Sequence, residues 1–373
     1  MTKAAELAKM GEVLDNSQIG RKNIIINGAM QIAQRSTSVT DLGAASGFFT
    51  LDRFYMIENA ASAGRFTMSQ SAVTDLEGFS NALKIDCTTA DTSIAAGEAL
   101  LIQQKIEGFN VQQLKATSTT TRAMTLSFYA KSNASRAIAS EIGMSNGTNN
   151  SASKLHTIGT SWARYTMTVP AASSTQIDND NSNEMQVNFW LHAGSTFTSG
   201  TMSASLEPVT NANRAAGIGS IFASTDNEIE ITGIQLEVGS QATPFEHRSF
   251  GEELELCKRY FQKTGNVSGN AYTPLTPYFD AATTSVGYCP IPLRPKMRLA
   301  SAIAVSHSGV GELGLSIGTG TSAVSAVALQ AAQSGEDFIT IKFTSSDTLT
   351  QYRPMRVYAN NDATAFIAFD AEL

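Results

Sequence analysis

The sequence predicts a mainly β protein in which an N-terminal helix precedes an antiparallel β-sandwich, a short linker helix and a second, smaller β-sandwich. Apolar and polar residues alternate in many segments between residues 23 and 246, and a period of two indicates strands with one buried face. Polar, turn-rich segments at 145–153, 173–183 and 207–215 separate these strands, which favours an antiparallel sandwich over a parallel α/β sheet. A clear helix start follows residue 248 and divides the two β regions.

Residues 1–22 are predicted to form an attachment or oligomerisation helix. Leu7, Met10 and Leu14 follow Ala4 at spacings of 3, 3 and 4, which gives a narrow apolar seam of the coiled-coil type. Two heptads are too few for a helix that is stable alone. We therefore expect the seam to meet copies of itself or a docking partner. The alternative is a frayed amphipathic tail.

Residues 23–247 are predicted to form the first sandwich. Met124, Leu126 and Phe128 alternate with polar or small residues in one of its segments, as expected for a strand with one face in the core. The opening segment, residues 23–32, is rich in isoleucine and is also predicted to be a strand.

Residues 248–263 are predicted to form the linker helix. Ser249 and Glu252 make a Ser-x-x-Glu capping box, and acidic residues precede basic ones along the segment, as the helix dipole favours. Apolar residues at i, i+4, i+7 and i+11 give one face. We expect this face to form an inter-domain or inter-subunit interface, and its residues are Phe250, Leu254, Cys257 and Phe261.

Residues 264–373 are predicted to form the smaller C-terminal β-domain. The region begins with a loop rich in Gly, Asn, Thr and Pro, and short alternating segments follow it. Pro290, Pro292 and Pro295 indicate an edge segment, where a missing backbone N–H costs little.

The composition narrows the classes of function. The chain has 373 residues, enough for two or three domains that each bury a core. Only 16% of residues are charged and the net charge is −7, which argues against nucleic-acid binding. No apolar run of about 18 residues predicts a membrane span, and we expect no secretory signal at the N-terminus. Three widely spaced cysteines, Cys87, Cys257 and Cys289, are expected to be buried free thiols of a chain folded in a reducing cytoplasm.

The sequence carries no catalytic or metal-binding pattern that predicts an enzyme. The four histidines are scattered, and no nucleophile elbow, phosphate loop or dinucleotide fingerprint is present. Asp178, Asp180 and Glu184 lie close together in a loop rich in Asn and Ser, where carboxylates are usually solvated. The alternative is that their oxygens hold Ca²⁺. We therefore predict no catalytic residue and no cofactor, with Ca²⁺ as the alternative.

Ligand binding, if it occurs, is expected to use aromatic side chains. Sugar rings stack on exposed aromatic faces beside short amide and carboxylate groups. The candidate ligand-binding residues are Trp162, Trp190, Tyr272, Tyr278 and Tyr288. Packing in a core or against a neighbouring subunit is the alternative for each of them.

Several motifs, taken together, resemble the tail-fibre and receptor-binding proteins of tailed bacteriophages. The resemblance spans about residues 23–263, with the motifs in the expected order. They are Asn23–Arg35, Asp52–Phe54, Gln104–Gly108, Thr125–Lys131, Trp162–Val169, Gln235–Glu246 and Gly251–Tyr260. Residues 264–373 fall outside the resemblance.

The resemblance implies an antiparallel jelly-roll β-sandwich similar to carbohydrate-binding modules, displayed as a homotrimer on a virion assembled in the host cytoplasm. It implies attachment through the N-terminus to other tail or virion proteins and contact with a host-surface glycan. Residues 264–373, outside the resemblance, are expected to be the variable part that reads the host. The alternatives are a capsid fibre or decoration protein, a polysaccharide depolymerase with a carbohydrate-binding module, and a structural spacer without a ligand.

Overall fold

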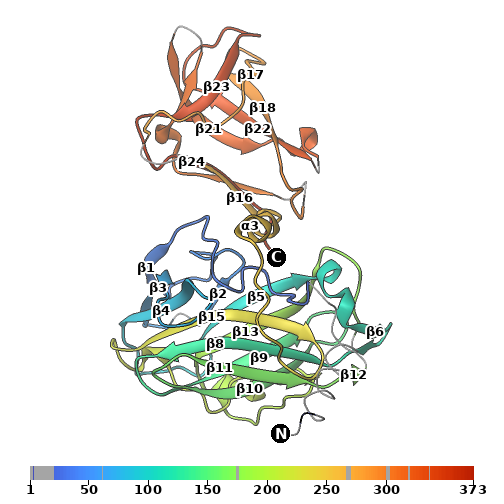
Figure 1. Cartoon of the computed structure of the whole chain (residues 1–373). Coiled ribbons are helices and arrows are strands. Elements are labelled where there is room, and N and C mark those ends of the chain that lie inside the picture. The colour runs from blue at the N-terminus through green and yellow to red at the C-terminus, as the bar shows by residue number, and fades with distance from the viewer. Residues whose placement is uncertain are drawn as a thin grey trace. The chain divides into compact units, whose positions relative to one another are not determined.

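A computed structural model of the chain contains mainly antiparallel β-sheets, which confirms the predicted fold class (Figure 1). The chain divides into two compact units, an N-terminal unit of Met1–Glu253 with Leu373 and a C-terminal unit of Leu254–Glu372. No helix in the described part of the chain is long and apolar enough to cross a membrane. The structure describes residues 3, 21–60, 62–173, 176–265, 270–299, 303–317, 320–335 and 337–373.

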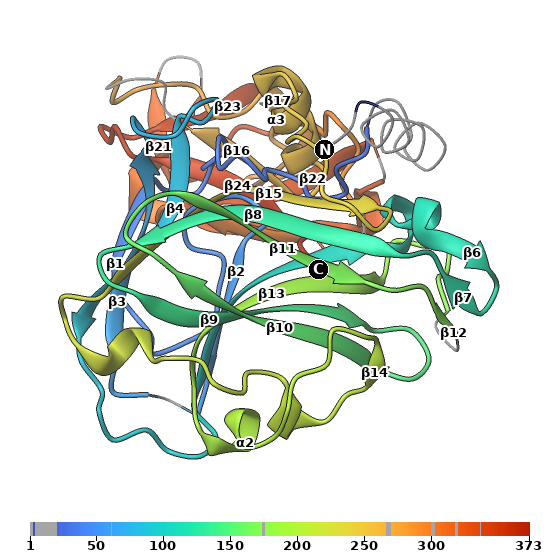
Figure 2. The ribbon, with the colours of Figure 1, turned by 60° about the horizontal axis from the view of Figure 1, so that its bottom comes forward.

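The N-terminal unit, within its described residues, is a sandwich of two six-stranded antiparallel sheets (Figure 2). Sheet 1 has the order β1-β3-β4-β15-β8-β11 and sheet 2 the order β14-β10-β9-β13-β5-β2. The strands of sheet 1 are β1 (Ser38–Leu42), β3 (Arg65–Ala72), β4 (Asn81–Thr89), β8 (Met124–Ser132), β11 (Ala163–Val169) and β15 (Glu228–Val238). Those of sheet 2 are β2 (Tyr55–Asn59), β5 (Ala99–Glu107), β9 (Arg136–Met144), β10 (Asn150–Ile158), β13 (Asn183–Ala193) and β14 (Glu207–Pro208).

Small elements fill the connections of this sandwich. A three-stranded sheet has the order β12-β7-β6. These elements are β6 (Lys115–Thr117), β7 (Thr120–Thr121), β12 (Ala172–Ser173), helix α2 (Ser195–Thr198) and the 3-10 helices η1 (Gly108–Asn110), η2 (Gln112–Leu114), η3 (Asn211–Asn213) and η4 (Ile221–Ala223).

The main core lies between the two sheets because alternate residues of each strand point inward. On β8 of sheet 1, Met124, Leu126 and Phe128 are fully buried in this core. On β13 of sheet 2, Val187 and Phe189 reach the same core. Residues between these inward positions therefore form the outer face of each sheet.

Residues 23–32 do not form the strand predicted from their composition. Asn27 and Met30 have positive φ angles of 60° and 57°, so the segment turns instead of extending. The buried Asn27 side chain stabilises the turn through three hydrogen bonds. Its Nδ2 donates to the carbonyls of Ile32 and Asp52 at 2.8 and 3.0 Å, and its Oδ1 accepts from Ile32 N at 2.9 Å. Asparagine tolerates this backbone region, which most residues avoid.

The first half of this segment lies along β15. Ile24 N donates to the carbonyl of Leu236 and Ile234 N to that of Gly28, both at 2.9 Å. A Cβ at Gly28 would lie 2.2 Å from the Ile234 carbonyl oxygen, so the close approach of the two backbones requires glycine here. β4 pairs with β15 only at residues 228–231. The segment therefore covers the part of β15 that β4 leaves unpaired.

Side chains from distant parts of the sequence satisfy the remaining backbone groups of the segment. Gln104 on β5 forms a reciprocal pair with Ile26, since Oε1 accepts from its N–H and Nε2 donates to its carbonyl, both at 2.9 Å. Glu253 accepts from Asn27 N at 2.5 Å and also from Arg248, which donates to the carbonyls of Asn23 and Ile25.

The linker helix, α3 (Phe250–Lys258), is shorter than the predicted range 248–263. Its predicted start holds, because Ser249 Oγ accepts from Glu252 N at 3.3 Å. Phe261 lies beyond the helix, in a strand that pairs with β24, so the four predicted residues do not share one helix face. Phe250 is 60% exposed and Leu254 is half-buried, and their inter-domain or inter-subunit interface stays a prediction. The predicted N-terminal helix, with Leu7, Met10 and Leu14, lies outside the described residues.

The C-terminal unit contains a three-stranded sheet, β16-β24-β19, and a six-stranded sheet, β17-β23-β20-β21-β22-β18, around one core. The bridge Ala281↔Gly287 brings the two ends of the larger sheet together. The strands are β16 (Phe261–Gly265), β17 (Phe279–Asp280), β18 (Val286–Pro292), β19 (Ala304–His307), β20 (Leu313–Ser316), β21 (Thr321–Leu329), β22 (Phe338–Ser345), β23 (Pro354–Ala359) and β24 (Phe366–Asp370), with 3-10 helices η5 (Val310–Glu312) and η6 (Ala331–Gln333). Cys87, Cys257 and Cys289 are buried free thiols, as predicted.

Candidate functional site

The outer face of sheet 2 carries a row of buried polar side chains. Gln103 on β5, Asn188 on β13 and Glu141 on β9 are direct cross-strand neighbours. Gln103 Nε2 donates to Asn188 Oδ1 at 3.0 Å, and Asn188 Nδ2 donates to Glu141 Oε2 at 3.3 Å. The row exists because these positions alternate with the inward-facing apolar ones.

Glu141 lies at the β9 end of this row, and both of its carboxylate oxygens accept hydrogen bonds. Arg214 Nε and Nη2 donate to its two oxygens at 2.8 and 3.1 Å, a bidentate arrangement. Trp190 Nε1 donates to the same carboxylate at 2.6 Å. The Arg214 guanidinium also lies 4.7 Å from the Trp190 ring centroid.

Trp190 cannot offer a ring face to a ligand, which corrects its predicted role. It is 1% exposed, because Phe197 of α2 and Ala215 pack with it in a small cluster on the outer face of sheet 2. Trp190 lies on the outer face because it alternates with inward-facing Phe189 and Leu191 on β13. The sequence did not reveal that the connection between β13 and β15 folds back over that face.

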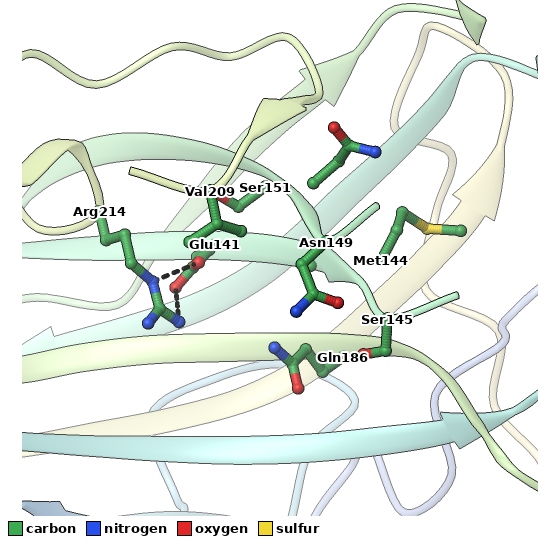
Figure 3. A pocket seen from close by; sticks show the side chains of 10 residues that line it. Glu141, Met144, Ser145, Asn149, Ser151, Gln186, Val209 and Arg214 are labelled. Atoms are coloured by element: carbon green, nitrogen blue, oxygen red, sulfur yellow. Dashed lines mark hydrogen bonds and ion pairs between the residues drawn. The ribbon is translucent and has the colours of Figure 1, made fainter. Parts of the chain in front are cut away.

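A pocket of about 310 Å³ opens beside the Glu141–Arg214 pair (Figure 3). None of its ten lining residues is aromatic. A Cβ on Gly143 would lie 2.8 Å from Gln186 Nε2, so this glycine leaves room for the amide that lines the pocket. Short amides and hydroxyls suit a ligand rich in hydroxyl groups. The lining polar groups include Ser145, Asn149, Ser151 and Gln186.

Glu184 lies at the start of β13 and is 2% exposed. Burial, with a smaller contribution from the nearby charges of Asp178 and Asp180, raises its pKa to about 7. Its Oε2 accepts from Asp178 N at 3.3 Å and from Asn146 Nδ2 at 3.4 Å. No group of three or more His, Cys, Asp or Glu side chains among the described residues is arranged to hold a metal ion. The described part of this loop therefore adds no support to the Ca²⁺ alternative.

Trp162 lies just before β11, on the outer side of sheet 1. Its Nε1 donates to Asp75 Oδ1 at 2.8 Å, and Lys131 Nζ lies 5.0 Å from its ring centroid. The ring is half-buried and packs against the small cluster around Phe79. One ring face is therefore occupied by a cation, and the residue is far from the polar row of sheet 2.

Two of the predicted tyrosines form an exposed row in the C-terminal unit. Tyr272 and Tyr278 are 59% and 65% exposed. The Tyr272 ring lies near-parallel to that of Tyr358, with an angle of 27° and centroids 6.5 Å apart. The guanidinium of Arg356 lies 5.1 Å from the Tyr278 ring centroid. We call these four residues the tyrosine row.

Sequence reasoning missed Arg356 and Tyr358, although a signal was available. In β23, buried Met355 and Val357 alternate with these two residues, so one outward face carries both. Tyr288 is not part of the row. It lies half-buried on β18, opposite Lys342.

The raised pKa of Glu184 predicts a pH-dependent stability. The folded protein holds the proton up to about pH 7 and the unfolded chain only to about pH 4.5. The contribution of Glu184 to stability should therefore fall by roughly 2–3 kcal/mol as the pH rises from about 4.5 to 7, while that of buried His156, whose pKa burial lowers to about 4, rises. In Glu184→Gln this fall should disappear, as measured by urea unfolding at pH 5 and pH 7.5. Glu77→Gln, which removes an exposed carboxylate, should keep the wild-type pH dependence. Equal pH profiles for wild type and Glu184→Gln would contradict this account.

No protein-family model matches the chain, and no curated protein matches it. Similar solved structures include the enzymatically active domain of tailspike protein 4 of bacteriophage CBA120, with 13% identity and a TM-score of 0.30 over 58% of this chain and 21% of that one. They also include the N-terminal cellulose-binding domain of Cellulomonas fimi β-1,4-glucanase C, with 12% identity and a TM-score of 0.26 over 50% and 90% of the two chains. A third is the family 11 carbohydrate-binding module of a Clostridium thermocellum cellulosomal cellulase, with 11% identity and a TM-score of 0.28 over 54% and 95%. At these scores the likeness carries no argument about function.

Proposed function

We propose that the chain is a virion structural protein of a tailed phage, a tail fibre or receptor-binding protein that contacts a host-surface glycan without cleaving it. The motifs between residues 23 and 263 that resemble such proteins support the virion role. The observation that carries the glycan contact is the exposed tyrosine row of the C-terminal unit. The proposed attachment to other virion proteins is through the N-terminus.

The tyrosine row has the properties of a sugar-binding platform. An exposed aromatic ring presents apolar area that a sugar ring can cover, while its hydroxyl stays in water. The contacts of Tyr272 with Tyr358, and of Tyr278 with Arg356, hold each ring against strand β23. A ring that is already ordered loses less side-chain entropy when it binds a ligand.

The pocket beside Glu141 supports a second contact with a hydroxyl-rich ligand. It supplies amide and hydroxyl groups but no aromatic ring. Its one carboxylate, Glu141, is held by Arg214 and Trp190. A general acid or base needs a free carboxyl within reach of the substrate. This arrangement supports binding over hydrolysis at the pocket, against the alternative of a depolymerase.

The location on the virion separates the tail fibre from the alternative of a capsid fibre or decoration protein.

The homotrimer is also part of the proposal. We expect the full chain to elute with three times the 39.6 kDa mass of one chain, as measured by light scattering, since the Leu7, Met10 and Leu14 seam favours self-association. A chain lacking residues 1–22 should elute with less than three times the mass of one truncated chain, because the apolar seam is removed. A monomeric full chain would overturn the trimer.

Removing either exposed ring should weaken glycan binding. We expect Tyr272→Ala and Tyr278→Ala each to reduce affinity for host-surface polysaccharide roughly tenfold, since each removes a stacking face. Binding would be measured by titration with polysaccharide purified from a susceptible bacterium, and the released reducing ends would be assayed in parallel.

Tyr352→Ala provides the matched control. Tyr352 is 76% exposed but lies in the turn before β23, outside the tyrosine row. The control should bind like wild type. Wild-type binding by both row variants, or release of reducing ends by the wild type, would contradict the proposed function.

A further inference from the structure

We infer that the tyrosine row binds an acidic saccharide, a sugar that carries a carboxylate, and that Arg356 is the residue that pairs with this group. The inference rests on the proposed function, because it names the class of glycan that the same surface would take.

Arg356 is a cation without a carboxylate partner. Arg214 pairs with Glu141 and Arg248 with Glu253, whereas the side chain of Arg356 forms no ion pair or hydrogen bond with any described residue. Its Nε is buried and unsatisfied. A buried donor that has lost water without gaining an acceptor destabilises the free protein. The two terminal nitrogens of the guanidinium are not among the buried unsatisfied atoms, and a carboxylate that accepts from them would neutralise the charge of Arg356.

The position of Arg356 is fixed by its neighbours. It alternates with inward-facing Met355 and Val357 on β23 and therefore lies on the same outward face as Tyr358. The Tyr278 ring lies on one side of the guanidinium, at 5.1 Å. This cation–π contact leaves the charge in place without neutralising it. The guanidinium thus lies among aromatic faces, where the ring of a sugar would stack.

Small residues on the neighbouring strand, β20, leave the surface beside the tyrosine row free of large side chains. Gly314 pairs with Tyr358 and Ser316 pairs with Arg356. A Cβ on Gly314 would lie 2.5 Å from the Tyr358 ring, so glycine allows the ring to lie flat across β20. A flat tyrosine beside a serine leaves room for a ligand to reach the guanidinium from the side of β20.

The chemistry of Arg356 and of the neighbouring tyrosine rings favours a sugar that carries a carboxylate. The planar guanidinium fork matches the two oxygens of a carboxylate and can bind them through two parallel hydrogen bonds. The tyrosine faces match the C–H face of a sugar ring. A neutral sugar would satisfy the rings but leave the charge of Arg356 without a partner.

The test is an array of acidic bacterial capsular oligosaccharides printed beside the same oligosaccharides after reduction of each carboxylate to a primary alcohol. We expect wild-type protein to prefer the acidic member of a pair by roughly tenfold or more. Arg356→Gln should lose this preference while retaining binding to the reduced member. Arg356→Lys, which keeps the charge but not the fork, should recover only part of the preference.

The controls separate a local effect from general loss of charge or fold. Arg294→Gln removes the same charge from an exposed position between β18 and β19 and should keep the wild-type preference. Tyr278→Ala should weaken binding to both members of each pair. Retained binding of Arg356→Gln to reduced oligosaccharides shows that the variant is folded.

Each outcome has one meaning. Equal binding to acidic and reduced members, or an unchanged preference in Arg356→Gln, overturns the acidic-saccharide inference and leaves the proposed function standing. Binding of phosphorylated oligosaccharides in place of carboxylated ones also overturns it. Absence of binding to every saccharide, in wild type and variants alike, overturns the proposed function and the inference together.

Discussion

The N-terminal unit depends on hydrogen bonds that side chains make to a buried segment without regular structure, residues 23–32. A buried backbone that is not in a helix or sheet must find other partners, because each unsatisfied N–H or C=O is costly. Asn23 and Asn27 of the segment itself, Gln104 of β5 and Glu253 of α3 supply these partners. The segment in turn covers the second half of β15. Sheet 1 therefore depends on the side-chain hydrogen bonds that hold this segment in place as well as on strand pairing.

This network joins four of the motifs that resemble phage receptor-binding proteins. Asn23 and Asn27 belong to the first motif, Gln104 to the third and Glu253 to the last. Glu246, in the motif before α3, accepts from Asn23 N at 2.7 Å and donates its own N–H to Gln235 at 2.8 Å. Residues more than 200 positions apart thus form one set of bonds. The chain between β15 and α3, first notable as a boundary, is the place where the sandwich is tied together.

Alternation of apolar and polar residues was sufficient to predict strands such as β8. Every second residue of β8 faces the core, which gives its sequence a period of two. The prediction failed for residues 23–32 because bonds from remote side chains outweighed local preference for a strand. The candidate sites were less predictable. The burial of Trp190 depends on a distant connection that packs over it. The pairing of Tyr278 with Arg356 depends on which strand lies beside β17, and a single sequence does not reveal strand order.

Native-state hydrogen exchange tests the central claim most directly. The backbone N–H groups of Ile25, Ile26, Asn27 and Ile32 all donate to side chains instead of to a neighbouring strand. If these bonds hold the unit together, the four amides should exchange only through global unfolding, with the same free energy as the core amides of β8 and β15. Exchange of the four amides through local opening, while β8 and β15 stay protected, would contradict the account.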